Sequence, residues 1–87
     1  MSKIKQLKKF VKKEWGIELD IKPADTLISI AERIVIRSEN CSIQDAYKKW
    51  IIKENMHLPG WVCFIIAEYF SLDHNSVDIY DRIDNLI

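Results

Sequence analysis

The sequence contains few of the residues that interrupt regular structure, since its 87 residues include only two glycines and two prolines. Hairpin-rich β proteins need more turns than these residues can supply, so their scarcity favours helices joined by short connections. No internal repeat or linker divides the chain, and its length suffices for one modest core. The sequence therefore predicts a single domain over residues 1–87.

Cysteine and histidine are scarce, and the net charge is zero. Two cysteines and two histidines are too widely scattered for a zinc site, so no metal is predicted. Thirteen basic and thirteen acidic residues cancel, so no overall field attracts the chain to nucleic acid. The longest apolar run, residues 61–67, is too short to cross a bilayer. A charged, amphipathic start is not typical of a signal peptide, so we expect a cytoplasmic protein that does not enter the membrane.

What the chain does contain is apolar residues at helical spacing. This pattern predicts helices over residues 4–15, 25–36, 43–51, 59–70 and 76–87. Residues 17–21 alternate instead, and we expect an extended loop that places Ile17, Leu19 and Ile21 in the core. The predicted fold class is all-α, a small bundle of four to five helices.

The third predicted helix combines a clear start with a basic outer face. Ser42 and Asp45 resemble a capping box. Five apolar residues follow at the spacing of one buried stripe: Ile43, Ala46, Tyr47, Trp50 and Ile51. Three lysines lie off this stripe and are predicted to face water: Lys48, Lys49 and Lys53. Ser42 has two interpretations, as an N-cap that stabilises the helix by about 0.5–2 kcal/mol over alanine or as an exposed hydroxyl for a phosphate-linked group.

Neither catalysis nor DNA recognition is supported by a complete motif. No G-x-S-x-G or related element is present, so a non-enzymatic protein without catalytic residues is predicted. Residues 66–83 can be aligned with a helix-turn-helix, with Ala67, Ser71 and Val77 at its packing positions. The helix that would enter DNA, however, carries acids that repel phosphate: Asp78, Asp81 and Asp84. The alternative function is a helix-turn-helix-like regulator or an immunity-type interaction protein that uses this acidic C-terminal helix.

Longer stretches resemble acyl carrier proteins. "LKKFVKKEWGIELDIKPADTL", residues 7–27, is similar to their first helix and long loop. "CSIQDA", residues 41–46, is similar to the start of their second helix, and "SVDIYDRI" resembles the opening of their last helix. The resemblance implies an acyl-carrier-like bundle in which Ser42 carries 4′-phosphopantetheine and Ser76 is a structural cap.

A closer similarity is to a family of acyl-carrier-like proteins of unknown function from enteric bacteria. Its short motifs occur here in the same order, as "FVKKEWGI", "IKPADTL", "QDAYKKW", "MHLPGW" and "EYF", over about residues 4–72. Two features depart from true carriers: Cys41 stands where an aspartate precedes the carrier serine, and the spacing from Leu27 to Ser42 is longer. The resemblance implies a non-enzymatic carrier-like module, with an extra or lengthened second helix, that docks with a protein partner.

Charge indicates which residues would contact that partner. True carriers have an acidic second helix, whereas this chain has lysines there, so docking on a basic synthase surface would be repulsive. We expect the partner-binding residues among Lys48, Lys49, Lys53, Asp78 and Asp81. The apolar excess around residues 61–70 leaves both a monomer and a homodimer open.

Overall fold

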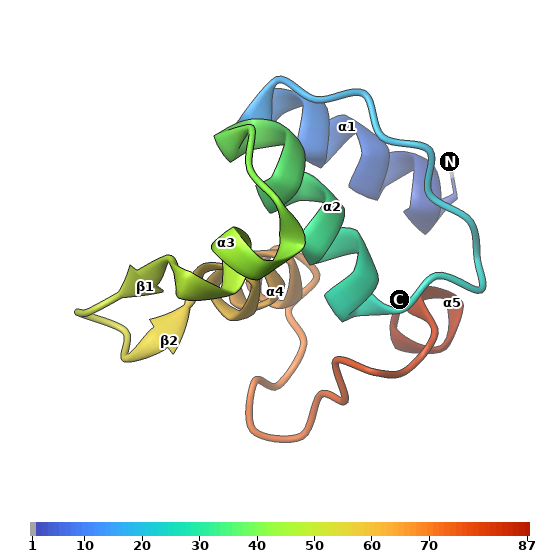
Figure 1. The fold of residues 1–87 in the computed structure, drawn as a ribbon. Coiled ribbons are helices and arrows are strands. Elements are labelled where there is room, and N and C mark those ends of the chain that lie inside the picture. Colours follow the sequence, from blue (N-terminus) through green and yellow to red (C-terminus); the bar gives the residue numbers. More distant parts are fainter. Residues whose placement is uncertain (1) are drawn as a thin grey trace.

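A bundle of helices with a short strand ribbon at one end makes up the computed structural model, which describes residues 2–87 (Figure 1). The helices are α1 (Lys3–Trp15), α2 (Leu27–Glu39), α3 (Ile43–Lys48), α4 (Leu58–Tyr69) and α5 (Ile83–Leu86). Strands β1 (Trp50–Ile51) and β2 (Met56–His57) pair antiparallel. The predicted helical character is confirmed, but the strand pair was not predicted, so the chain is mostly helical and not purely α.

The first helix forms where the apolar spacing predicts it. The Ser2 hydroxyl accepts a hydrogen bond from the backbone N–H of Lys5 at 3.2 Å and caps its start. Leu7 and Val11 are fully buried. Gly16 ends the helix in the left-handed conformation, with φ of 69°, which glycine adopts without a Cβ clash.

The long loop after α1 contributes to the core, as predicted from its alternation. Ile17, Leu19 and Ile21 are all buried. Two arginines of α2 hold the loop from outside: Arg37 Nη1 donates to the carbonyl of Glu18 at 2.7 Å, and Arg33 Nη1 to the carbonyl of Asp20 at 2.8 Å. The loop is therefore fixed along α2 by side chains inside and polar contacts outside.

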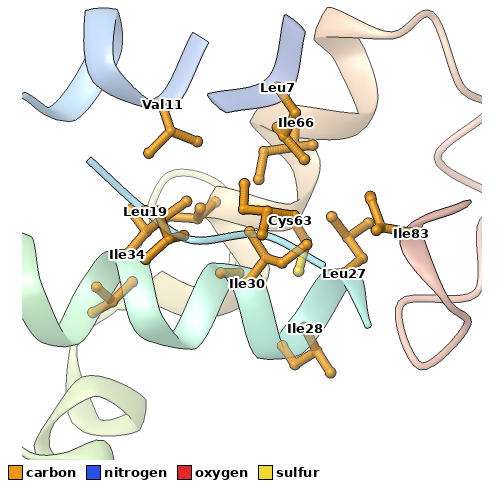
Figure 2. Packing of buried hydrophobic residues seen from close by; sticks show 14 of the residues in the cluster. Leu7, Val11, Leu19, Leu27, Ile28, Ile30, Ile34, Cys63, Ile66 and Ile83 are labelled. Atoms are coloured by element: carbon orange, nitrogen blue, oxygen red, sulfur yellow. The ribbon is translucent and has the colours of Figure 1, made fainter. Parts of the chain in front are cut away.

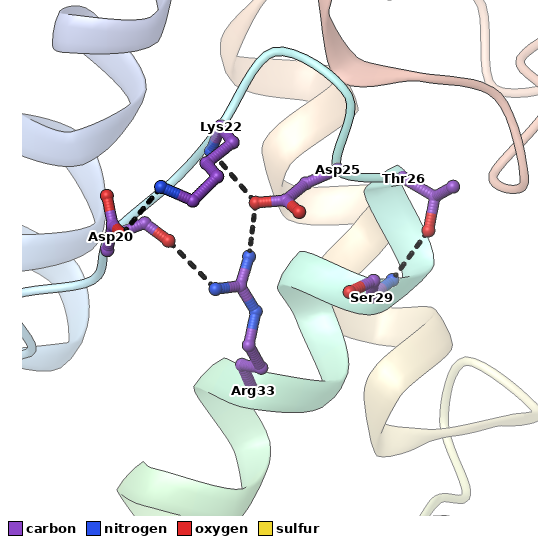
Figure 3. Close-up of polar contacts among 6 residues, drawn as sticks. All are labelled: Asp20, Lys22, Asp25, Thr26, Ser29 and Arg33. Atoms are coloured by element: carbon purple, nitrogen blue, oxygen red, sulfur yellow. Dashed lines mark hydrogen bonds and ion pairs between the residues drawn. The ribbon is translucent and has the colours of Figure 1, made fainter.

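The start of α2 is held by its own side-chain cap, by an ion pair and by the C-terminal segment. Thr26 caps the helix by accepting from the N–H of Ser29 at 3.2 Å, and the Asp25 carboxylate accepts from Arg33 Nη2 at 2.8 Å (Figure 3). The C-terminal segment covers the same helix end, because the N–H of Ile28 donates to the carbonyl of Ile79 at 2.9 Å. These bonds satisfy donors that a helix start otherwise leaves free.

The core lies between α2 and α4, with α1 packed over it. Figure 2 shows Leu7 and Val11 of α1, Leu27, Ile30 and Ile34 of α2, Cys63 and Ile66 of α4, and Ile83 of α5 converging on this centre. The predicted α4 is confirmed, with Pro59 in its first turn, where a missing N–H costs no hydrogen bond. Within residues 2–87, no helix is both long and apolar enough to span a bilayer.

The third helix is shorter than the sequence predicts. It ends at Lys48, and the last two residues of the expected stripe, Trp50 and Ile51, belong to β1. Only Ala46 of that stripe is fully buried, whereas Ile43 is 36% and Trp50 is 52% exposed. The prediction of one buried stripe over residues 43–51 is therefore wrong, because β-branched and aromatic residues here enter a hairpin.

The fifth helix is also predicted wrongly. It was expected to begin at Ser76, but residues 76–82 form turns and extended backbone, and only Ile83–Leu86 is helical. Tyr80, which a helix beginning at Ser76 would place on its core side, is 73% exposed. The carbonyls of Ile79 and Asp81 accept hydrogen bonds from the first N–H groups of α2, and a helix over this segment would use those carbonyls internally.

Candidate functional site

Ser42 lies where the sequence predicts it, exposed at the start of α3. Its hydroxyl oxygen accepts a hydrogen bond from the backbone N–H of Asp45 at 3.1 Å. A serine hydroxyl has a second lone pair and its own proton, so this bond leaves it able to meet another partner. The structure thus makes Ser42 a helix cap and leaves its oxygen accessible.

The helix that begins at Ser42 is held to the core by two of its residues. Ala46 is fully buried, and the Tyr47 hydroxyl donates a hydrogen bond to the Glu32 carboxylate on α2. Burial, followed by this hydrogen bond, raises the pKa of Tyr47 well above its usual value. Tyr47 therefore stays a neutral donor, and it ties α3 to α2.

His57 joins the hairpin to α4. Its Nδ1 accepts a hydrogen bond from the N–H of Gly60 at 2.9 Å and caps α4, while its ring packs edge-on against Tyr47, with 4.7 Å between ring centroids. A Cβ on residue 60 would lie 3.0 Å from the His57 ring, so glycine permits this close approach. This cap was not predicted from the sequence, because histidine is not among the residues that usually cap a helix start.

We expect His57→Ala to destabilise the protein by about 1 kcal/mol, because the N–H of Gly60 loses its cap. His57→Asn is the matched variant, since an asparagine side chain also accepts from the start of a helix. Urea unfolding measured by circular dichroism compares the two variants. Equal losses of stability would show that ring packing, and not the cap, accounts for the effect.

The hairpin carries large apolar side chains into solvent. Trp50 pairs with His57 and Ile51 with Met56, and Asn55 adopts a left-handed φ of 53° that closes the turn. In Figure 1 this hairpin extends away from the helices. Ile52 at its turn is 87% exposed. These two neighbouring apolar side chains in solvent make the hairpin a candidate docking surface.

The predicted lysines surround this hairpin but are not equally free. Lys48 is exposed, with its Nζ 4.0 Å from the Asp45 carboxylate, and Lys53 is exposed in the turn. Lys49 is partly buried, with its Nζ 3.7 Å from the Glu39 carboxylate. Lys48 and Lys49 therefore precede the hairpin and Lys53 lies in its turn, and Lys49 is the most constrained of the three.

The acidic residues of the alternative hypothesis do not line one helix face. Asp78 is exposed and accepts from the N–H of Tyr80 at 2.9 Å. Asp81 is partly buried and accepts from the side chain of Asn85 at 3.0 Å. Because no helix forms over residues 76–82, the helix-turn-helix interpretation lacks its second helix, and Ser76 is not a helix cap.

A separate groove of about 610 Å³ runs along α1. Its lining consists of lysines of α1 and residues of the following loop: Lys8, Lys9, Lys12, Lys13, Glu18, Leu19 and Asp20. None of the predicted site residues lines it. Across residues 2–87, no cluster of three or more histidine, cysteine or acidic side chains is placed to hold a metal ion.

Comparisons with protein-family models, with curated proteins and with solved structures found no match to this chain. The candidate site is therefore defined by its own geometry, as an exposed serine at a helix start beside a lysine-flanked hairpin with two exposed apolar side chains.

Proposed function

We propose that the chain is a non-enzymatic acyl-carrier-like protein, related to the carrier-like family of enteric bacteria, that docks with a protein partner and is loaded with 4′-phosphopantetheine at Ser42. The observation that supports this function is the exposed Ser42 hydroxyl, which begins a helix after a helix, a long loop and a second helix. This order of elements is the one that the resemblance to carriers leads us to expect, with one helix added.

The added helix and the charge set this chain apart from a true carrier. α2 stands between the long loop and Ser42, so the proposed attachment site begins the third helix. The exposed Lys48 and Lys53 make the neighbouring surface basic. A partner that docks here is expected to present acidic groups, because like charges would slow the encounter and weaken the complex.

Loading would transfer a phosphopantetheine group from coenzyme A to Ser42. The Ser42 oxygen forms a bond to phosphorus as the pyrophosphate P–O bond breaks, adenosine 3′,5′-bisphosphate leaves with the electron pair, and a base of the transferase takes the hydroxyl proton. This chain supplies only the accessible oxygen, and the transferase supplies the catalysis.

Intact-mass spectrometry after incubation with coenzyme A and a broad-specificity phosphopantetheinyl transferase tests the proposal. We expect the mass of the wild type to rise by one phosphopantetheine group and that of Ser42→Asn to remain unchanged. Asparagine is an N-cap comparable to serine, so this variant removes the hydroxyl and keeps the helix start. Ser42→Ala removes both, and it should lose about 1 kcal/mol of stability as well.

An unchanged mass of the wild-type chain would contradict loading. A mass increase that persists in Ser42→Asn would place the group on another residue. Equal thermal midpoints of the wild type and Ser42→Asn would show that the variant is folded, so that its unchanged mass reflects the missing hydroxyl.

A further inference from the structure

The hairpin tip presents an apolar side chain that its own chain does not cover. Ile52 is 87% exposed, and Trp50 nearby is 52% exposed. Lys53 follows Ile52 in the turn and is exposed as well. Burial of an exposed apolar side chain in an interface stabilises a complex, and a neighbouring charge favours a partner surface of the opposite sign.

The same molecule contains an apolar pocket of about 140 Å³. Its walls come from β2, α4 and the C-terminal segment and include Met56, Cys63, Phe64, His74, Val77 and Ile79. An apolar space of about 150 Å³ accommodates a benzene-sized group, so the pocket can receive one branched aliphatic side chain. The exposure of Ile52 shows that this side chain does not occupy the pocket of its own chain.

Acidic residues are next in sequence to several residues that line this pocket. Asp73 precedes the lining residue His74, and Asp78 stands between Val77 and Ile79; both aspartates are exposed. The apolar tip thus carries a lysine and the apolar pocket is flanked by aspartates. The tip and the pocket are therefore complementary in polarity and in charge.

We propose that two copies of this chain dock with the Ile52 side chain of each in the Cys63 pocket of the other, and with Lys53 of each beside Asp78 of the other. The tip and the pocket adjoin, because Met56 lines the pocket and pairs with Ile51 in the hairpin. A two-fold axis between the copies then forms both contacts at once and closes the assembly at two. This dimer does not depend on loading at Ser42.

Sedimentation equilibrium of the full chain tests the dimer, over about 5 to 500 µM, where weak homodimers dissociate. We expect a reversible monomer–dimer equilibrium. Ile52→Asn should raise the dimer dissociation constant about tenfold or more, since it removes the apolar anchor. The side chain is exposed, so the thermal midpoint of the diluted variant should match that of the wild type.

A charge exchange makes the test specific to the proposed pairing. Lys53→Glu alone and Asp78→Lys alone should each weaken the dimer, because each places like charges together. The double variant Lys53→Glu/Asp78→Lys should restore much of the affinity. A chain that stays monomeric at every concentration would overturn the proposal and leave a different protein as the occupant. A dimer unaffected by Ile52→Asn, a double variant without recovery, or masses growing beyond two copies would overturn it equally.

Discussion

Replacing Ile83 with alanine is expected to lower the free energy of unfolding by about 3 kcal/mol, the middle of the range for truncating a fully buried isoleucine. Ile83 has no exposed surface and belongs to the core cluster. Its backbone N–H also donates to the carbonyl of Asp25 at 2.7 Å, directly before α2. The side chain therefore closes the core at the point where the C-terminal segment covers the start of α2.

The loss of stability should extend to the hydrogen bonds that the C-terminal segment makes with the start of α2. The N–H groups of Leu27 and Ile28 donate to the carbonyls of Asp81 and Ile79, and a loosened segment leaves these donors open to water. Amide hydrogen exchange at Leu27 and Ile28 should accelerate more in Ile83→Ala than exchange in α4.

Ile52→Ala provides the matched control, since it removes the same atoms from a side chain that is 87% exposed. Its effect should stay within about 0.5 kcal/mol when urea unfolding is measured in dilute solution, where association does not contribute. An Ile83→Ala loss below about 1 kcal/mol, or equal losses in both variants, would show that the C-terminal segment is not part of the cooperative core.

The three long helices could be predicted from sequence because local and tertiary preferences agree there. In α1, α2 and α4 the apolar spacing and the buried residues coincide. The structure of the loop before α2 could equally be predicted, since its alternating apolar residues, Ile17, Leu19 and Ile21, are the buried ones. Periodicity is reliable where one set of residues serves both the element and the core.

The hairpin and the C-terminal segment could not be predicted because their structure depends on distant partners. The spacing from Ile43 to Ile51 fits a helix, yet β1 forms because it pairs with β2, and β2 leads into the cap of α4. Carbonyls within residues 76–82 likewise accept hydrogen bonds from the start of α2, and no local sequence pattern predicts these bonds. The hairpin part of the candidate site could not be predicted for the same reason, since Ile52 becomes exposed only when the hairpin forms.

The thiol of Cys63 faces the interior and is held neutral. It is 3% exposed, and burial, followed by the nearby Glu32 carboxylate, raises its pKa to about 12. The pKa of an unfolded cysteine is about 8.5. Above that pH the unfolded chain therefore binds fewer protons than the folded one. The stability linked to this thiol is therefore fully present below about pH 8.5 and is lost as the pH rises towards 12.

The same pKa predicts a large kinetic effect, which the variant Cys41→Ser isolates because it leaves Cys63 as the remaining thiol. At pH 8 a thiol with a pKa near 12 has roughly three orders of magnitude less thiolate than an unperturbed one. Disulfide-exchange labelling of the native variant should therefore be at least about fiftyfold slower than labelling of the same variant in denaturant, since the greater nucleophilicity of a high-pKa thiolate offsets only part of its scarcity. Rates within tenfold of each other would mean that the pocket beside Cys63 opens to solvent freely. A pocket that opens so readily would also lack the fixed walls that the proposed dimer contact requires.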